Sequence, residues 1–185
     1  WLFGQQSSEP WYNAGTTFPF APYPSLIVPY GIAAPFSAAI SDGAISWLGA
    51  TRIGQGEVLR ATGFTPEIVS DYALNFAVSQ YATLSDAVAE SFNFLGHVFY
   101  LLNFPSENVT WAFDVREKKW FKWMTWISEE NKYVAWRPRW HAMAFNEHRM
   151  LDASTGAVYR MSADLPLDVD ARPIRRLRRA PAVVA

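Results

Sequence analysis

Hydrophobic and polar positions alternate along this chain in short runs, and residues that favour turns separate the runs. Apolar runs cover residues 44–48 and 57–62, around three glycines, and residues 88–94 and 98–104, around Leu95-Gly96-His97. Short apolar runs between turn residues predict β-hairpins. Gly96 can adopt the positive φ that a tight hairpin turn requires. We therefore predict a mainly β chain built from antiparallel hairpins.

An aspartate closes the first strand of two further predicted hairpins, and an apolar residue follows it six positions later. In one hairpin Asp114 precedes Trp120, and in the other Asp152 precedes Val158. Asp152 can hydrogen-bond to the backbone of its own turn, while Gly156 can take the left-handed conformation. The two aspartates lie 38 residues apart, close to the roughly 40 to 50 residues of a β-propeller blade. We interpret the two turns as a repeated blade edge.

The strand expected over residues 120–126 carries large side chains on both of its faces. Trp120, Met124 and Trp126 lie on one face, and Phe121 and Trp123 lie on the other. A sheet exposed to solvent on one side would alternate apolar and polar residues. Both faces of this strand should therefore be covered, as between the blades of a β-propeller.

One helix is predicted between the hairpins. Thr65 is a suitable N-cap, and Pro66 suits the first helical position. Apolar residues then recur at helical spacing over residues 68–77. The pattern predicts a helix over residues 66–81.

Composition limits the classes of protein that need to be considered. Half of the 185 residues are hydrophobic and 16% are aromatic, which suits one domain with a substantial core. The chain has no cysteine, so disulfides and thiolate chemistry are excluded. The most apolar stretch, residues 25–40, contains two prolines and is too short to span a membrane. Because the chain begins at Trp1 without a methionine, we expect it to be a fragment or a processed product.

The net charge of −1 conceals an asymmetry between the two ends of the chain. Residues 1–110 contain eight acidic and two basic residues, a balance of −6, whereas residues 111–185 contain nine acidic and fourteen basic residues, a balance of +5. The basic residues culminate in Arg172, Arg175, Arg176, Arg178 and Arg179. This cluster can contact nucleic acid or an acidic partner, or it can be a solvated tail or the polar face of a final strand. We divide the chain into a partial β-propeller domain (1–171) and a basic C-terminal segment (172–185), interpreted as a truncated next strand.

Residues that could support catalysis or metal binding do not form a convincing set. His141 and His148 are seven positions apart, which fits no common metal-ligand spacing. His97 lies beside a turn glycine and is better explained as a structural, hydrogen-bonded residue. The adjacent acids Glu129 and Glu130 fit a hairpin loop better than a glycosidase pair. We therefore predict neither an enzyme nor a bound metal or cofactor.

A series of motifs, in order along the chain, resembles one known family. They are Glu9-Pro-Trp11, Gly63-Phe64-Thr-Pro, Ser85-Asp86-Ala87, Gly96-His97-Val-Phe99-Tyr100, Thr110-Trp111, and Asp152 with Ser154-Thr-Gly156 and Val158-Tyr159. The family is the packaged-DNA stabilization protein, or tail hub, of short-tailed bacteriophages. The resemblance covers roughly residues 2 to 179.

The resemblance implies a β-propeller-like, non-enzymatic virion protein that is made in the bacterial cytoplasm and placed in the phage tail. It implies a hub below the portal that closes the exit channel, with portal and tail proteins as partners. Open sheet edges predict self-association, and any contact with DNA should be non-specific. An alternative is a carbohydrate-binding, lectin-like β module with tryptophans exposed on its surface. A β-propeller hydrolase would need convergent carboxylates, and no pair of acids in the sequence suggests them.

Overall fold

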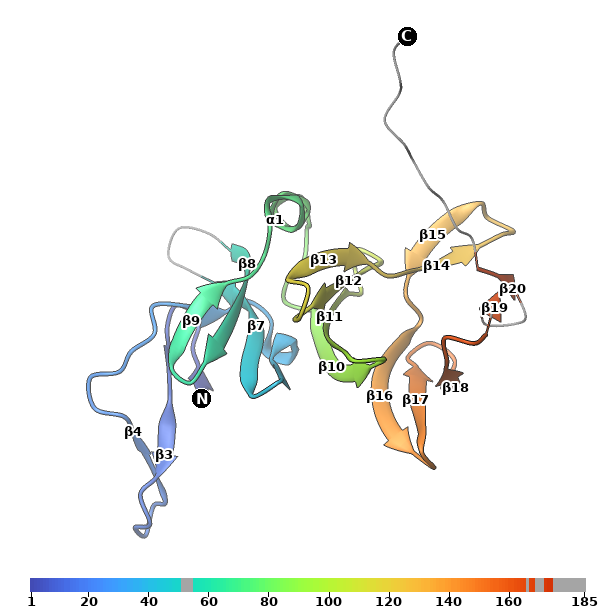
Figure 1. Ribbon diagram of the computed structural model, residues 1–185. Coiled ribbons are helices and arrows are strands. Elements are labelled where there is room, and N and C mark those ends of the chain that lie inside the picture. Colours follow the sequence, from blue (N-terminus) through green and yellow to red (C-terminus); the bar gives the residue numbers. More distant parts are fainter. Residues whose placement is uncertain (51–54, 166, 169–171, 175–185) are drawn as a thin grey trace.

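The computed structural model describes residues 1–50, 55–165, 167–168 and 172–174. Within these ranges the chain is mainly β, and every pair of named strands is antiparallel. Three sheets follow one another along the molecule (Figure 1). The predicted fold class of antiparallel hairpins is therefore confirmed.

Each of the three sheets is built from strands that are close in sequence. The first contains β5 (Gly31–Ile32), β6 (Ala39–Ser41), β7 (Ala44–Ala50), β8 (Gln55–Thr62) and β9 (Thr65–Ile68), with β5 and β6 both pairing with β7. The second contains β10 (Val88–Phe94), β11 (His97–Phe104), β12 (Val109–Asp114) and β13 (Lys119–Lys122). The third contains β16 (Pro138–Ala144), β17 (Glu147–Asp152) and β18 (Val158–Met161).

Smaller elements surround these sheets. Four two-stranded ribbons pair β1 (Leu2–Phe3) with β2 (Ser8–Glu9), β3 (Trp11–Asn13) with β4 (Phe20–Pro22), β14 (Met124–Ile127) with β15 (Lys132–Ala135), and β19 (Leu167–Asp168) with β20 (Arg172–Pro173). A short 3₁₀ helix, η1 (Pro35–Ser37), precedes β6. The β3–β4 ribbon extends away from the sheets (Figure 1).

The same two-residue turn joins the first two strands of each sheet, counting β6 as the first strand of the first sheet. The turns are Asp42-Gly43, Leu95-Gly96 and Phe145-Asn146, and φ is positive at all six residues. Two central residues with positive φ define the type I′ turn, whose twist matches that of antiparallel strands. The strands β6, β10 and β16 begin at residues 39, 88 and 138, which are 49 and 50 positions apart. The structural repeat is therefore about 50 residues long.

This repeat corrects our interpretation of the two aspartate turns. Asp114 ends β12, the third strand of its sheet, whereas Asp152 ends β17, the second strand of its sheet. The two aspartates occupy different positions in successive sheets, so their spacing of 38 residues is not the blade period.

The predicted helix is shorter and begins later than expected. Residues 65–68 form β9, which pairs with β8, and α1 runs from Tyr72 to Ser79. The N-cap is Asp71, whose side chain accepts a hydrogen bond from the Leu74 amide at 2.8 Å. The prediction of a helix over residues 66–81 was wrong at its start because Asp71 is an equally good cap, and because residues 65–68 form backbone hydrogen bonds with β8.

The long aromatic strand expected over residues 120–126 is divided between two sheets. β13 ends at Lys122, and β14 begins at Met124 as part of a separate ribbon. The Trp123 amide still donates to the Thr110 carbonyl at 3.0 Å before the chain leaves the second sheet. The hairpins predicted over residues 44–62 and 88–104, and the hairpin predicted around Asp152 and Val158, are confirmed by the observed pairing.

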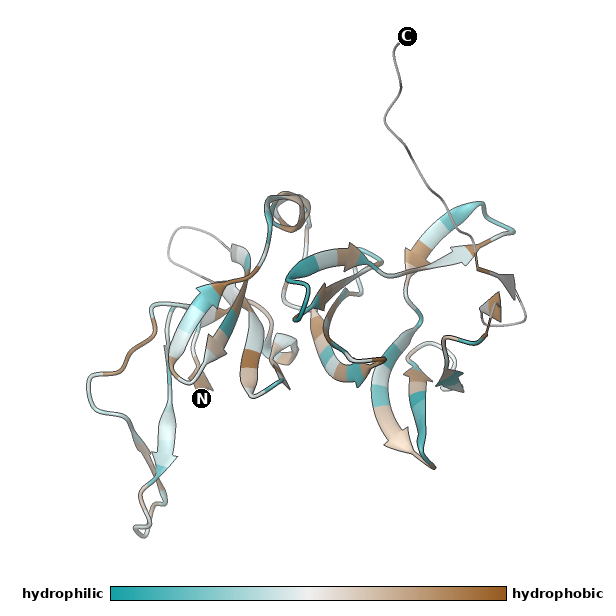
Figure 2. Cartoon of the chain, viewed as in Figure 1, coloured by the Kyte–Doolittle hydropathy of each residue, from teal (hydrophilic) through white to brown (hydrophobic). Residues whose placement is uncertain are grey.

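The second sheet is covered on both faces. Leu102, Phe104 and Phe113 pack towards the first sheet and α1, with Leu48, Val58, Leu74 and Val78. On the opposite face Phe92, Leu101 and Ala112 pack with Met150 of the third sheet. Hydrophobic positions recur along β10 and β11, whereas β15 and β16 are more hydrophilic (Figure 2). This arrangement of sheets with both faces buried is that of neighbouring propeller blades.

Side-chain hydrogen bonds also connect the second sheet to the first sheet and to η1 beside it. The buried Tyr100 hydroxyl donates to the Ser37 carbonyl at 2.7 Å, and the Ser91 hydroxyl donates to the Ile40 carbonyl at 2.5 Å. Burial raises the pKa of Tyr100 well above its ordinary value, so this hydroxyl remains a donor. The contacts fix the position of β10 against β6 and η1.

Candidate functional site

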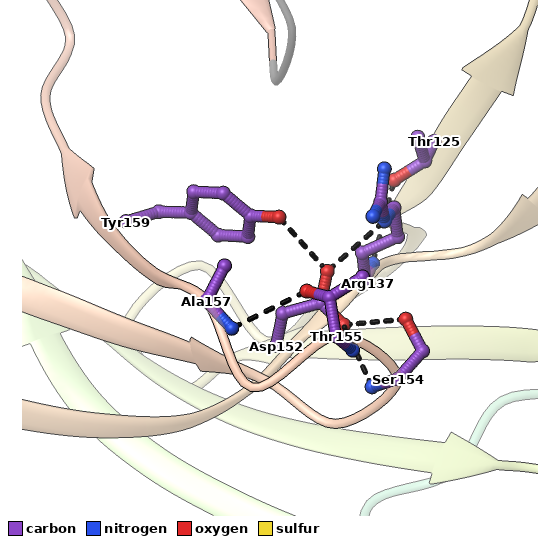
Figure 3. A network of polar contacts seen from close by, with 7 residues as sticks. All are labelled: Thr125, Arg137, Asp152, Ser154, Thr155, Ala157 and Tyr159. Carbon is purple, nitrogen blue, oxygen red and sulfur yellow. Dashed lines mark hydrogen bonds and ion pairs between the residues drawn. The ribbon is translucent and has the colours of Figure 1, made fainter.

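The Asp152 carboxylate lies at the centre of a network of polar contacts (Figure 3). One oxygen, Oδ1, accepts hydrogen bonds from the Ser154 amide at 2.7 Å, the Ser154 hydroxyl at 2.6 Å and the Thr155 amide at 3.2 Å. The other, Oδ2, accepts from the Arg137 Nε at 3.0 Å and the Tyr159 hydroxyl at 2.9 Å. Asp152 is only 1% exposed. The carboxylate thus joins its own turn to β18 and to the segment before β16.

The hydrogen bonds keep this buried carboxyl ionised. Burial alone would raise the pKa of Asp152, but the hydrogen bonds from Ser154, Tyr159 and Thr155 lower it well below its ordinary value. Gly156 has a φ of 72°, and its amide donates to the Asp152 carbonyl at 3.0 Å. The turn that the sequence suggested is therefore present around Asp152 and Gly156.

Asp114 forms a related turn between β12 and β13. Its Oδ1 accepts hydrogen bonds from the amides of Arg116 and Glu117 at 3.0 and 3.2 Å, and its Oδ2 lies 2.6 Å from His97 Nδ1. Burial raises the pKa of Asp114, but the hydrogen bonds from Glu117, His97 and Arg116 outweigh this effect and lower it. Gly96, with a φ of 82°, lies in the turn directly before His97. These contacts connect the two hairpins of the second sheet.

Neither aspartate is placed for catalysis. In both residues the carboxylate is buried. Its oxygens accept hydrogen bonds from backbone amides of the turn and contact at least one other side chain. In the described part of the chain, no group of three or more His, Cys, Asp or Glu side chains could hold a metal ion. The geometry of both turns fits structural residues.

The tryptophans are mainly packing residues. Trp47 and Trp111 are buried, and Trp120, Trp123 and Trp126 are half-buried. Where tryptophan rings contact each other, they are inclined: the Trp123 and Trp136 planes differ by 82° and the Trp1 and Trp47 planes by 46°. A sugar-binding platform needs rings that lie flat on the surface, so the packing does not favour a lectin-like module.

Large apolar side chains are exposed at the tips of hairpins, and the sequence reasoning missed them. Phe145 is 91% exposed and Leu95 is 69% exposed, both at the first position of a type I′ turn. At the tip of the β3–β4 ribbon, Phe18 and Phe20 are 67% and 56% exposed. An apolar residue directly before a turn-forming glycine or asparagine, as in Leu95-Gly96 and Phe145-Asn146, is the pattern in the sequence that could have identified the two turn tips.

Basic side chains occupy a second part of the surface. Arg116, Lys118 and Lys119 are exposed around the β12–β13 turn, and Lys122 is exposed at the other end of β13. Of the predicted arginine cluster, Arg172 contributes its backbone to β20, whereas Arg175, Arg176, Arg178 and Arg179 lie outside the described residues. No helix in the described ranges is long and apolar enough to cross a membrane.

The third sheet also brings together two histidines that lie seven positions apart in the sequence. His141 Nε2 and His148 Nδ1 are 2.9 Å apart. Burial and the neighbouring His148 lower the pKa of His141. The pair results from the turn at Phe145-Asn146, which folds β17 back along β16.

A comparison with models of known protein families assigns the chain to one family. A family model described as "Bacteriophage P22 Gp10, beta-propeller" matches residues 1–165. No curated protein sequence matches the chain. The matched region contains all three sheets, and the described strands agree with the β-propeller of that description. The chain belongs to this family of structural proteins of the phage virion, which stabilise packaged DNA.

Proposed function

We propose that the protein is part of the tail hub of a short-tailed bacteriophage, where it closes the DNA exit channel and connects the portal to the tail. Membership of the stabilisation family over residues 1–165 supports the association with packaged DNA. The observation that carries the proposed connecting role is the exposure of Leu95 and Phe145 at the tips of successive sheets. Such residues are suited to a contact with another protein.

The positions of these two residues favour a common docking face. Leu95 follows β10 and Phe145 follows β16, the first strands of the second and third sheets. The first strands of successive propeller blades run in the same direction, so the hairpins that follow them lie on the same face. Exposed apolar residues gathered on one face mark protein interaction sites. The portal and the tail proteins are the proposed partners, and copies of the chain would associate side by side around the channel.

The proposed role is mechanical rather than enzymatic. Asp114 and Asp152, the two buried aspartates of the turns, already accept hydrogen bonds from turn amides and other groups. They therefore have no free position from which to act on a substrate. Any contact with DNA would involve phosphates and basic side chains and would not depend on sequence.

The proposal can be tested on phage particles assembled without this protein. Particles with DNA-filled heads should lose their DNA and their infectivity, and purified protein added before the DNA is released should prevent both losses. Retention of DNA in particles that lack the protein would refute the stabilising role. If particles without the protein kept their DNA but failed to attach the tail, the role of the protein would be limited to connecting the portal to the tail.

A surface variant tests the docking face separately. Phe145→Asn removes the exposed ring while placing a residue suited to the type I′ turn at this position. We expect it to reduce binding to DNA-filled particles at least tenfold in a sedimentation assay. The control is Val158→Thr, a β-branched replacement at another exposed apolar position, on β18. Equal binding of both variants would exclude this face as the contact.

A further inference from the structure

Two of the three histidines of the chain, His141 and His148, meet on the β16–β17 hairpin. In the ladder His141 lies opposite Met150, and Met143 lies opposite His148. Paired residues project from the same face of a sheet, so the two imidazoles are diagonal neighbours on one face. Nε2 of His141 and Nδ1 of His148 are hydrogen-bonded at 2.9 Å. A metal ion bound by both nitrogens would replace this hydrogen bond, and the proton of the donor ring would move to that ring's other nitrogen.

Aromatic rings from the second sheet hold both imidazoles in place. The Phe92 ring stacks on His141, with ring centroids 4.8 Å apart and planes inclined by 24°. Phe94 meets His148 edge-on, with a centroid distance of 5.1 Å. Both histidines are half-buried, so an ion can approach them from solvent. Side chains that packing already orders lose little freedom on binding a ligand.

The distance between the nitrogens suits one coordination geometry in particular. Imidazole nitrogens bind transition metals at about 2.0–2.1 Å. An ion at that distance from two nitrogens 2.9 Å apart makes an angle of roughly 90° with them, smaller than the tetrahedral angle. An angle of about 90° between neighbouring ligands is typical of square-planar and tetragonal copper(II) and nickel(II) sites.

We propose that His141 and His148 form a two-histidine site for a divalent transition-metal ion, with copper(II) as the best match. Copper(II) is bound most tightly among the first-row divalent ions by nitrogen ligands. In the described residues no third side chain completes a group with the pair that could hold a metal ion, so water molecules complete the coordination. The remaining histidine, His97, lies 2.6 Å from Asp114 and serves a different contact.

Metal binding at this site would reinforce the third sheet. The ion would link β16 to β17 through side chains, in addition to the backbone ladder. Because it binds only when both histidines are brought together, it would stabilise the folded chain relative to the unfolded chain. The site does not depend on the hub function proposed above.

The test is a titration of the intact chain, purified without a histidine tag, with copper(II) chloride. We expect one equivalent to bind, with an electron paramagnetic resonance spectrum that shows coupling to two imidazole nitrogens. His141→Phe, which keeps a ring against Phe92, and His148→Gln should each weaken binding at least tenfold. The matched control is His97→Gln, which should bind copper within twofold of the wild type.

Thermal unfolding provides a second readout that also checks folding. Copper should raise the unfolding temperature of the wild type and of His97→Gln, and it should leave that of His148→Gln unchanged. Circular dichroism without metal establishes that each variant is folded. Equal copper affinity in all four proteins, or no uptake by the wild type at micromolar concentration, would overturn the proposal.

Discussion

The carboxylate of Asp152 connects residues that are distant along the chain. It accepts hydrogen bonds from Arg137, fifteen positions earlier, and from Tyr159, seven positions later. It also organises the turn through Ser154 and Thr155. Buried charges are tolerated where hydrogen bonds replace the lost contacts with water. This residue is therefore the point at which β17, β18 and the segment before β16 are held together.

Replacement of Asp152 should destabilise the fold markedly. In Asp152→Asn, one of the two accepting oxygens is replaced by an NH₂ group, which cannot accept the hydrogen bonds made there. The Arg137 guanidinium also loses its carboxylate partner at this site. We expect a loss of about 2–4 kcal/mol in the free energy of unfolding. Urea unfolding followed by tryptophan fluorescence measures it. Asp164→Asn, at an exposed carboxylate, is the control and should change stability by less than about 0.5 kcal/mol.

Stability should fall at acid pH because of Asp114 and Asp152. The pKa of each is lower in the folded chain than its ordinary value, which is about 3.9 in an unfolded chain. Below about pH 5 the unfolded state therefore binds more protons, and the stabilisation is lost progressively as the pH falls. The urea midpoint of the wild type should decrease between about pH 5 and pH 3 more steeply than that of Asp152→Asn. Parallel profiles would contradict this assignment.

The turn residue Phe145 should be replaceable with a gain in stability. Its φ of 55° lies in the left-handed region, which costs a residue other than glycine about 1–2 kcal/mol. Its ring is 91% exposed and gains little from packing. Phe145→Asn should therefore raise the unfolding free energy by up to about 1 kcal/mol, since asparagine tolerates this conformation. Phe121→Asn, at an exposed strand position on β13, is the control and should give no gain.

At the residue scale, local contacts were predictable and contacts between strands were not. Asp152 and Gly156 form the turn that their types and spacing favour. The contact of Asp152 with Arg137 depends on where the chain lies before β16, which no local pattern specifies. His141 and His148 become neighbours because Ala144 pairs with Glu147 across a two-residue turn. Their spacing of seven positions has no meaning without that register.

At the element scale, hairpins were easier to predict than the helix start. The hairpin over residues 88–104 was predictable because two apolar runs flank a turn glycine. Residues 65–68 satisfy the rules for a helix N-terminus equally well, and only the pairing with β8 assigns them to β9. The division of residues 120–126 between two sheets likewise depends on partners that lie elsewhere, such as β15 for β14.

The close contact of β5 with the N-terminal segment predicts that a larger residue at Gly31 would destabilise the fold. A Cβ atom added at Gly31 would lie 2.3 Å from the carbonyl carbon of Gln5 and 2.5 Å from the Gln6 nitrogen, both backbone atoms. Gly31→Ala must therefore move β1 and β2 away from the first sheet, with an expected cost of about 2–3 kcal/mol. The melting temperature from circular dichroism measures this cost.

Gly15→Ala is the matched control for the same substitution. Gly15 has a φ of 65°, and an added Cβ would meet no atom within 4 Å. Its cost should be limited to backbone strain, about 1 kcal/mol. Equal destabilisation by the two variants would show that the close approach at Gly31 carries no special cost.

At the scale of the whole molecule, the charge asymmetry is the feature with the clearest consequence for binding. The balance of −6 over residues 1–110 and +5 over residues 111–185 gives the chain opposite charges at its two ends. The fold class was predictable from the strand pattern, but the blade period was not. The aspartate turns, 38 residues apart, are conspicuous in the sequence, whereas the type I′ turns that mark the repeat contain three different residue pairs.

The basic residues give a prediction for DNA binding. Replacement of Arg172, Arg175, Arg176, Arg178 and Arg179 with alanine should weaken binding to duplex DNA and reduce the slope of log K against log salt by about one unit for each arginine in contact. Fluorescence anisotropy at several salt concentrations measures this slope. Alanine at Lys118, Lys119 and Lys122 removes three exposed charges from β12–β13 and is the control. A larger effect of the lysines would place the contact on the second sheet.

The order of strands within the sheets also has a consequence for synthesis on the ribosome. The three main sheets are complete within residues 31–68, 88–122 and 138–161. Each can form as soon as its own last strand emerges, because its pairing uses contacts that are local in sequence. When Tyr100 emerges, the Ser37 carbonyl that accepts its hydrogen bond already lies in η1, against the finished first sheet. The nascent chain can therefore grow blade by blade, each one templated by the blade made before it.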